Sequence, residues 1–323
     1  MGTDEPALLL VGAERWSTGL ALSLRPVQFL AVGGVALTRG DRMSEAPDGA
    51  IDGTVSRETL PRPSGTRVLV VVNQKGGVGK TTTAVNMAAA LANGGLSVLL
   101  VDMDPQGNAS TALGVDHRQG VRGTYEVLIE QDEMAWHVVP SPEAPRLSVL
   151  PATIDLAAAE IELVSIVGRE HRLLDALSAY LSANSHDYVI LDCPPSLGLL
   201  TLNALVAAKE ILIPIQCEYY ALEGVSQLVR TINLVKGNLN DRLRVSTVIL
   251  TMYDARTKLS AQVADEVRRH FPTETLEAAI PRSVRVSEAP SYGQTVISYS
   301  PGSPGADAYV SAASEIAYRE GAQ

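Results

Sequence analysis

One short segment limits the folds open to this chain more than any other. It reads Val68-Leu-Val-Val-Val-Asn-Gln-Lys-Gly-Gly-Val-Gly-Lys-Thr-Thr-Thr83, which is an apolar run, a glycine-rich stretch and then a helical pattern. Gly76, Gly77 and Gly79 give the backbone conformational freedom that other residues lack. A strand that passes through a glycine-rich turn into a helix is a recognised unit of parallel α/β sheets. The segment therefore predicts a parallel sheet with its ligand-binding edge at this turn.

The rest of the chain from Arg67 onwards continues the alternation of strand and helix. Six apolar runs predict strands: Val68–Val72, Val98–Val101, Leu147–Leu150, Tyr188–Leu191, Ile211–Ile215 and Val245–Leu250. Helical patterns include Thr82–Ala92, Ala157–Val164, Arg172–Ser182, Leu222–Val235, Ala261–His270 and a last one near Asp307–Tyr318. Near-continuous apolar strands are buried on both faces. We predict one α/β domain over 66–323, with a doubly wound, mostly parallel sheet and helices on both faces.

Residues 1–65 differ in composition from this domain. The part from Met43 to Gly65 is rich in Asp, Glu, Ser, Pro and Gly, which is typical of a disordered tail. We expect 1–65 to be a disordered or weakly ordered extension, and we hypothesise that translation naturally starts at Met43, so that residues 1–42 reflect an upstream start. The chain has two cysteines, Cys193 and Cys217, so a disulfide framework or a cysteine-rich zinc site is excluded, and a cytoplasmic setting is expected.

The glycine-rich segment has the chemistry of a phosphate-binding loop. Successive backbone N–H groups from Gly76 to Gly79, including that of Val78, would face phosphate oxygens at the positive end of the following helix. Lys80 would neutralise phosphate charge, the hydroxyl of Thr81 would bind Mg²⁺, and Thr82 would reach the α-phosphate. The expected cofactors are therefore ATP and Mg²⁺.

The loop departs from the usual G-x-x-x-x-G-K-[ST] pattern in an informative way. Gln74 stands where the first glycine would be, and an additional lysine, Lys75, precedes Gly76. A second lysine has little phosphate left to contact within its own subunit. We therefore hypothesise that Lys75 reaches across a dimer interface to the nucleotide of the partner, in a nucleotide-sandwich homodimer.

Three aspartates follow the predicted strands at the edge where ligands bind in such sheets. Asp102 and Asp104 belong to Val-Asp-Met-Asp-Pro-Gln-Gly-Asn (101–108), and Asp192 ends the apolar run Tyr188–Leu191. Asp104 is placed to orient an attacking water or to hold a Mg²⁺-bound water, and Asp102 to support the loop or the metal shell. Asp192 is expected to hold Mg²⁺ through water. The predicted reaction is slow hydrolysis of ATP, since no arginine in these motifs is placed to stabilise the transition state.

Six motifs together resemble the ParA/Soj partitioning ATPases, which belong to the deviant Walker A superfamily. They are N-Q-K-G-G-V-G-K-T-T-T (73–83), V-D-M-D-P-Q-G-N (101–108), D-C-P-P-S-L-G (192–198), Q-C-E-Y-Y-A-L-E-G (216–224), T-M-Y-D-A-R-T (251–257) and I-P-R-S-V-R-V-S-E-A-P-S-Y-G (280–293). The resemblance covers 66–323 in order. It implies an ATP-dependent dimer that binds double-stranded DNA without sequence preference, and a ParB-type partner that stimulates hydrolysis during chromosome or plasmid segregation. The implied localisation is nucleoid-associated.

The resemblance also assigns roles to single residues. It makes Lys75 the cross-dimer lysine, Asp104 the residue needed for hydrolysis and Asp192 the Walker B acid. It implies DNA contacts by Arg256 and Arg285, and places Met252 and Pro281 at the border of the adenine. Arg230 is added as a DNA contact only because it lies in the same basic segment.

Net charge at first argues against a nucleic-acid partner, because the whole chain carries −10. The charge is unevenly distributed: residues 226–285 hold ten Lys or Arg against six Asp or Glu, a balance of +4. A local patch of this kind, doubled in a dimer, would suffice for salt-dependent DNA binding.

The same deviant loop occurs in other classes of protein. MinD-like ATPases are the main alternative, but they bind membranes through a basic amphipathic C-terminal helix. Here the final residues place Arg319 between Glu315 and Glu320, so no membrane binding is expected. Iron proteins related to nitrogenase need cluster cysteines, and Cys193 and Cys217 lie in the wrong motifs. An amidoligase or a tyrosine kinase of the superfamily is a further possibility.

Overall fold

The computed structural model describes residues 59–319 except 220, together with the backbone but not the side chains of 221–223. Predictions for 1–58, including the alternative start at Met43, lie outside the described residues. At the beginning of the described part, the Leu60 amide donates to the Gly94 carbonyl at 2.9 Å, and its side chain packs against the core. The boundary predicted at residue 66 stays a prediction.

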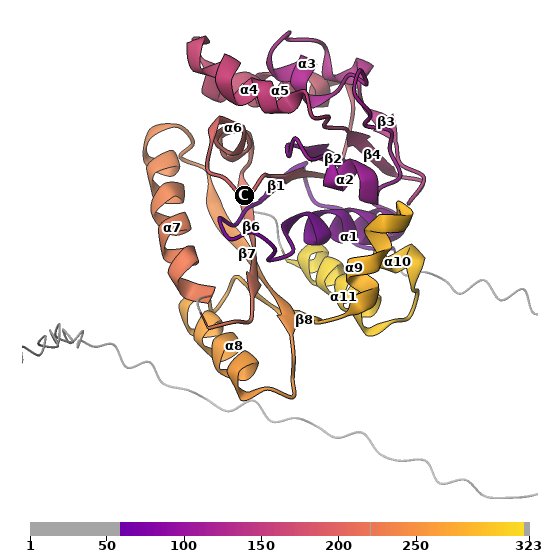
Figure 1. Ribbon diagram of the computed structural model, residues 1–323, viewed down its shortest axis with the longest axis vertical. Helices are drawn as coiled ribbons and strands as arrows, with labels where there is room; N and C mark the ends of the chain where they lie inside the picture. Colours follow the sequence, from indigo (N-terminus) through magenta and orange to yellow (C-terminus); the bar gives the residue numbers. More distant parts are fainter. Residues whose placement is uncertain (1–58, 220, 320–323) are drawn as a thin grey trace, which may run out of the picture. The chain divides into compact units, whose positions relative to one another are not determined.

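Eight strands form one sheet in the order β3-β4-β2-β5-β1-β6-β7-β8 (Figure 1). Their bounds are β1 Arg67–Val71, β2 Val98–Asp102, β3 Val139–Pro140, β4 Leu147–Leu150, β5 Tyr188–Asp192, β6 Glu210–Gln216, β7 Arg244–Tyr253 and β8 Thr275–Pro281. Every neighbouring pair is parallel except β3 with β4. The predicted fold class is confirmed. Neither edge strand was among the predicted strands, because β3 has two residues and Glu277 interrupts the apolar run of β8.

Helices cover both faces of the sheet (Figure 1). Those that bury residues against one face are α3 Thr124–Leu128, α4 Leu156–Glu162, α5 Arg172–Ala183, α6 Leu199–Ala207, α7 Ala221–Asn238 and α8 Lys258–His270. The opposite face is covered by α1 Lys80–Asn93, α2 Asn108–Ala112, α10 Val296–Tyr299 and α11 Pro304–Tyr318, while α9 Val284–Glu288 packs beside α11. Short 3₁₀ turns are η1 Met134–Trp136, η2 Leu163–Ser165, η3 Arg169–His171 and η4 Ala289–Tyr292.

The two cores on either side of the sheet follow from strand alternation. Val68 and Val70 point to the α5–α6–α7 side, whereas Leu69 and Val71 point to α1 and α11. Because most positions of the central strands are apolar, both faces acquire a core. No helix in the described part of the chain is long and apolar enough to span a membrane.

A buried ion pair links the first strand to the far end of the chain. Arg67, 6% exposed, donates from Nε and Nη2 to the Glu210 carboxylate at 2.8 and 2.7 Å. Its Nη1 donates to the Ile316 carbonyl at 2.7 Å and to the Tyr188 hydroxyl at 3.1 Å. Buried charges are tolerated only when paired and hydrogen-bonded, and these contacts meet that requirement. Arg67 thereby joins β1, β5, β6 and α11.

Candidate functional site

The glycine-rich loop connects β1 to α1 at the carboxyl edge of the sheet. Gly77 and Gly79 have φ of 74° and 87°, a left-handed conformation that favours glycine. Thr251 of β7 donates its hydroxyl to the Val78 carbonyl at 2.8 Å. Asn73 donates to the Pro214 carbonyl at 2.7 Å and accepts from the Lys75 amide at 3.0 Å, so neighbouring strands hold both ends of the loop.

Helix α1 begins without a side-chain cap. Its N-cap is Gly79, so no side chain accepts a hydrogen bond from the first turn. First-turn N–H groups without partners and the positive end of the helix dipole form a site for an anion. Thr81 and Thr82 lie in this turn. Their predicted contacts, with Mg²⁺ and with the α-phosphate, stay predictions.

The two loop lysines differ in burial and direction. Lys80 is 7% exposed, and its amino group donates to the Lys75 carbonyl at 3.1 Å, inside the loop. Burial lowers the pKa of Lys80, while the charges of Asp192 and Asp104 oppose that change. The Lys75 side chain is 39% exposed and pairs with Glu218 at 3.2 Å, outside the loop. One lysine therefore faces the interior of the glycine-rich loop, and the other faces away from it.

The three aspartates meet where β2 and β5 end. Asp102 and Asp192 are register partners on these adjacent strands, and both are fully buried. Asp102 accepts from the Asp104 amide at 3.1 Å, and from the Ser110 amide and hydroxyl at 2.9 and 2.8 Å. Burial, with a smaller contribution from the charge of Asp104, raises the pKa of Asp102 to about 7, although the Ser110 hydrogen bonds oppose the rise.

Asp192 has no comparable hydrogen bonds. Neither of its carboxylate oxygens has a hydrogen-bond partner within the described residues. Burial, and then the charge of Asp102, raise its pKa well above the ordinary value; Thr81 and Lys80 oppose this rise, although the Thr81 hydroxyl does not reach hydrogen-bonding geometry. A buried carboxylate without partners is costly unless a cation or ordered water satisfies it.

These residues fit the predicted magnesium ion by their chemistry. Two orphaned oxygens of Asp192 lie in the neighbourhood of Lys80, Thr81 and Asp104. Among the residues that the structure describes, no three His, Cys, Asp or Glu side chains form a metal cage. Mg²⁺ does not need one, because it keeps several waters and is held by one or two carboxylates together with substrate phosphates.

A small cavity of about 170 Å³ lies beside the start of α1. It is lined by Gly79 and Thr82 from the loop side, and by Met252 and Pro281 from the ends of β7 and β8. Met252 has φ of 51°, which is uncommon for a residue with a Cβ and marks local backbone strain. The structure thus brings the two predicted adenine neighbours to one cavity next to the loop.

Comparison with known proteins places these residues in a family. A family model described as an AAA domain matches residues 66–245. The chain is 50% identical over 251 residues to the sporulation initiation inhibitor protein Soj of Bacillus subtilis, which covers 78% of this chain and 98% of that protein. It is 50% identical over 254 residues to the chromosome partitioning protein ParA of Caulobacter vibrioides, covering 79% and 95%. The chain belongs to the ParA/Soj family of chromosome-partitioning ATPases.

A solved structure in the same fold contains a nucleotide. The cobyrinic acid a,c-diamide synthase from Mycobacterium smegmatis, with bound ADP and magnesium, is 40% identical and superposes with a TM-score of 0.67, covering 78% of this chain and 94% of that one. ADP and magnesium are therefore known to occupy this fold in a structural relative of the ParA/Soj chain. The identity to the two partitioning proteins is higher, at 50%.

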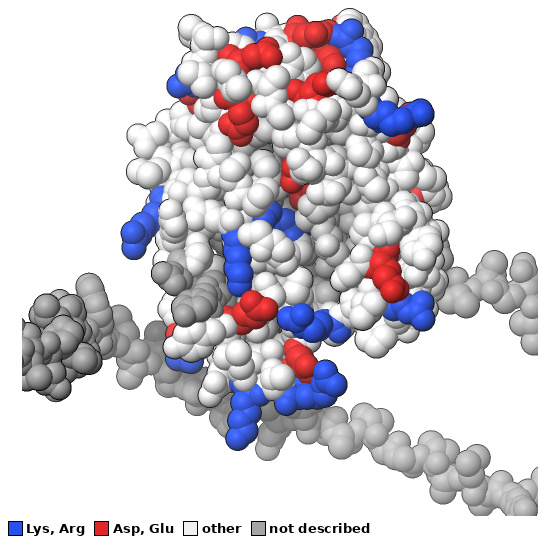
Figure 2. Space-filling model, in the orientation of Figure 1, with Lys and Arg blue, Asp and Glu red and all other residues white. Residues whose placement is uncertain are grey.

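The predicted DNA-contacting arginines of this ParA/Soj chain are all exposed. Arg256 lies in the turn after β7, where its 89% exposed side chain pairs with Asp254 at 2.9 Å. Arg285 lies on α9 and Arg230 on α7. Figure 2 shows Lys and Arg side chains gathered, with some Asp and Glu among them, at the end of this face where α8 and β8 lie. No described contact joins Arg230 to the other two.

Three residues near the site were not predicted from the sequence. Glu218 holds Lys75, Thr251 holds Val78, and Ser110 holds Asp102. Glu218 and Thr251 lie within motifs that the ParA/Soj resemblance covers. The sequence shows these motifs, but it does not show which residues the two side chains contact. Ser110 follows Asp102 by eight residues on α2, and no short motif connects them.

Proposed function

We propose that this ParA/Soj chain is an ATP-dependent DNA-partitioning protein. Its ATP-bound form is a sandwich dimer that binds DNA without sequence preference, and a ParB-type partner stimulates hydrolysis and releases the dimer. The observation that carries the proposal is the opposed pair of loop lysines. Lys80 is buried in the loop, whereas Lys75 is half-exposed and held outside it by Glu218.

The chain's own residues divide the work of hydrolysis among them. The loop amides and Lys80 bind and orient the phosphates, and Asp104 orients the water for in-line attack. Thr81 and Asp192 would hold Mg²⁺, whose chemistry is to neutralise phosphate charge. In the dimer, the Lys75 amino group leaves Glu218 and places its positive charge against the nucleotide of the other subunit. Intrinsic turnover is slow, because no arginine of the loop and aspartate motifs is placed to stabilise the transition state.

The DNA-binding part of the proposal rests on exposed arginines close to the nucleotide cavity. Arg285 lies two residues after Ser283, which lines the same cavity as Met252. Arg256 follows Met252 by four residues along the chain. Nucleotide-dependent dimerisation would bring two such patches together, so that ATP controls DNA affinity. The protein would then be nucleoid-associated in the ATP state.

Charge reversal at Arg256 tests this part. We expect Arg256→Glu to weaken ATP-dependent binding to a random DNA duplex by about tenfold or more, and to lower the salt slope by about one for each phosphate that the variant no longer neutralises. The matched control is Arg118→Glu, because Arg118 is 86% exposed and pairs with Asp116, also two residues before it. Fluorescence anisotropy over a salt series measures both the DNA affinity and its salt slope. Equal binding by the two variants would contradict the assignment.

Replacement of Asp104 tests the assigned role in hydrolysis. We expect Asp104→Ala to bind ATP and dimerise like the wild type, while hydrolysis falls by roughly 10²–10⁴-fold, the usual contribution of a positioned general base. Phosphate release and light scattering measure the two properties separately. Asp241→Ala, an exposed carboxylate on the loop before β7, is the control. Loss of ATP binding in Asp104→Ala would assign the residue to binding instead.

A membrane-associated, MinD-like role makes the opposite prediction about ATP-dependent binding. The chain would then bind lipid and not a DNA duplex. Arg319, the basic residue after α11, is occupied by carbonyls of residues 274 and 275 and by Glu315. It is therefore engaged in holding the C-terminal helix to β8. Binding to anionic liposomes with ATP, and no binding to DNA, would favour the alternative.

A further inference from the structure

A ridge of exposed aliphatic side chains lies on α4 and the segment that follows it. Ile161, Val164 and Val167 are 77%, 60% and 97% exposed, and we call them the α4–η2 ridge. Ile161 and Val164 are three residues apart, so they lie on one side of the helical segment. Single exposed aliphatic residues are ordinary, but neighbouring ones on a folded chain mark interaction surfaces.

A hollow opens beside the ridge. It has a volume of about 380 Å³ and lies between Val164 of the ridge, Gly198 and Leu202 at the start of α6, and Thr231 of α7. Its wall also includes Glu160, one position before Ile161. Ridge and hollow together offer a raised and a recessed apolar element, which suits a short segment of another polypeptide.

The surroundings of the ridge are acidic. Residues 124–175 contain ten Asp or Glu and three Lys or Arg, a balance of −7. Figure 2 shows Asp and Glu side chains gathered at the end of this face where α3, α4 and α5 lie, opposite the basic end. A DNA backbone would be repelled here, and so would a second copy of the chain placed ridge to ridge. A cationic segment with apolar residues is the complementary occupant.

The Glu160 carboxylate links the ridge to the start of α6, next to the loop that follows Asp192. Its Oε2 accepts from the Leu199 amide at 2.9 Å, and its Oε1 from the Leu200 amide at 3.2 Å. These amides open α6, which begins where the loop after Asp192 ends. A Cβ on Gly198 would lie 2.4 Å from the Glu160 carboxylate, so the contact is close. Movement of α4 would therefore reach the loop that follows Asp192.

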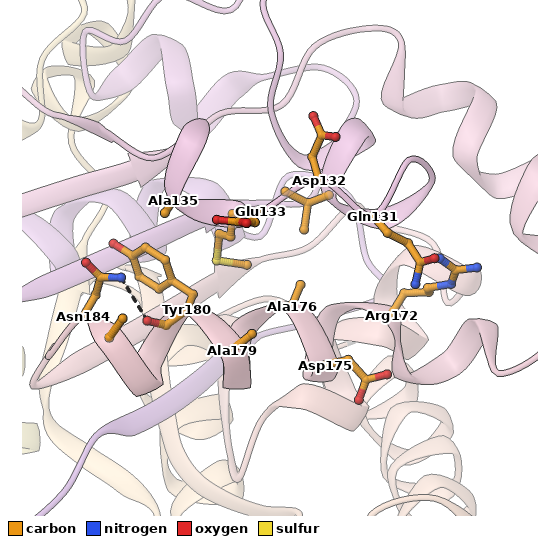
Figure 3. Close-up of a pocket in the computed structure, with 13 residues that line it drawn as sticks. Gln131, Asp132, Glu133, Ala135, Arg172, Asp175, Ala176, Ala179, Tyr180 and Asn184 are labelled. Atoms are coloured by element: carbon orange, nitrogen blue, oxygen red, sulfur yellow. Dashed lines mark hydrogen bonds between the residues drawn. The ribbon is translucent and has the colours of Figure 1, made fainter.

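A larger cavity farther along this layer does not share that connection. It measures about 430 Å³ and lies between η1 and α5, with Arg172 and Gln131 at one end and Tyr180 and Asn184 at the other (Figure 3). No contact described for its walls reaches Asp192 or the phosphate loop. The ridge is therefore the better placed of the two for a partner that acts on hydrolysis.

We propose that the α4–η2 ridge and its hollow dock a cationic, apolar segment of the ParB-type partner, and that Glu160 transmits this docking to the loop after Asp192. The proposal rests on the proposed function, since it locates the contact through which the partner stimulates hydrolysis. Glu160 is a positioning residue, because it acts through the start of α6.

The test uses the full chain and the full-length ParB-type protein of the same source organism. Val164→Arg places a positive charge on the ridge, and Val310→Arg is the matched control at an exposed valine of α11. We expect Val164→Arg to lower partner affinity by at least tenfold and to remove the stimulation of ATP hydrolysis, with basal hydrolysis and DNA binding unchanged. Val310→Arg should behave as the wild type.

A second variant separates docking from transmission. At saturating partner concentration, where any difference in affinity no longer matters, Glu160→Ala should show about a tenfold smaller stimulated rate than the wild type, and Glu160→Gln should restore part of that rate. A normal response by Val164→Arg would overturn the docking site while leaving the proposed function intact. Loss of ATP-dependent dimerisation in Val164→Arg would also overturn it, by making the ridge an interface between copies. A wild-type chain that ignores the partner would overturn the proposed function itself.

Discussion

Replacement of Lys75 by alanine is expected to abolish ATP-dependent dimerisation while leaving ATP binding by the monomer within about twofold of the wild type. The reason is geometric, because Lys80 already lies in the loop whereas the Lys75 amino group pairs outside it with Glu218. An arginine supplied to a transferring phosphate contributes about 10³-fold or more to the rate, and we expect an effect of the same order for Lys75. Hydrolysis by Lys75→Ala should therefore fall by about that factor.

Three measurements separate the possible roles of Lys75. Isothermal titration reports ATP affinity, light scattering reports dimerisation, and phosphate release reports turnover. Lys209→Ala, which removes an exposed lysine just before β6, is the control for loss of charge. If Lys75→Ala dimerises and hydrolyses ATP normally, the cross-dimer role is wrong. If it fails to bind ATP, Lys75 serves its own subunit's nucleotide.

Loss of the Glu210 carboxylate is expected to cause the largest fall in stability. Arg67 and Glu210 are 6% and 2% exposed, so Glu210→Leu leaves a buried guanidinium without its counter-charge. Breaking a buried ion pair from one side costs about 3–5 kcal/mol of unfolding free energy. Urea unfolding followed by circular dichroism measures the change, with Glu277→Gln on the surface of β8 as the control.

The same pair gives a pH dependence with a defined sign. Burial raises the pKa of Glu210, but the hydrogen bonds and charge of Arg67 outweigh burial and hold it below its ordinary value of 4.5. A carboxylate with a lowered folded-state pKa stabilises fully above its unfolded pKa, and loses that contribution as the pH falls through the folded value. The difference between wild type and Glu210→Leu should therefore shrink below about pH 4.5. A constant difference at acidic pH would show that packing, not charge, explains it.

The parts of the site that were predictable are those encoded by neighbours in sequence. The loop from Asn73 to Thr83 and the aspartates at the ends of β2 and β5 depend on short motifs, because strand, turn and helix follow each other directly. The doubly wound sheet was predictable for a similar reason, since apolar strands alternate with helical patterns. Their roles in catalysis remain predictions, but their positions did not require knowledge of distant contacts.

The parts that were not predictable depend on distant partners. Glu218 meets Lys75 across 143 positions of the chain, and Thr251 meets Val78 across 173. Arg67 looks like a polar residue that opens a strand, yet it is buried because Glu210 is buried beside it. Glu160 looks like part of a solvated acidic helix, but it caps α6. Local propensity carries no information on such pairings.

The contact of Arg67 with the Ile316 carbonyl also bears on the order in which parts of the chain can fold during synthesis. β1 is made first, but its sheet neighbours are β5 and β6, and Ile316 follows Arg67 by 249 positions. Loop-closure entropy must be overcome before contacts so far apart can stabilise anything. The glycine-rich loop between β1 and α1 is held by Pro214 of β6 and Thr251 of β7, so we expect it to lack this support on the ribosome until β7 has been made. A chain that stops before α11 would lack the Ile316 carbonyl, so we expect the buried Arg67 to lose one of its hydrogen-bond partners and β1 to stay less stable until the last helix is complete.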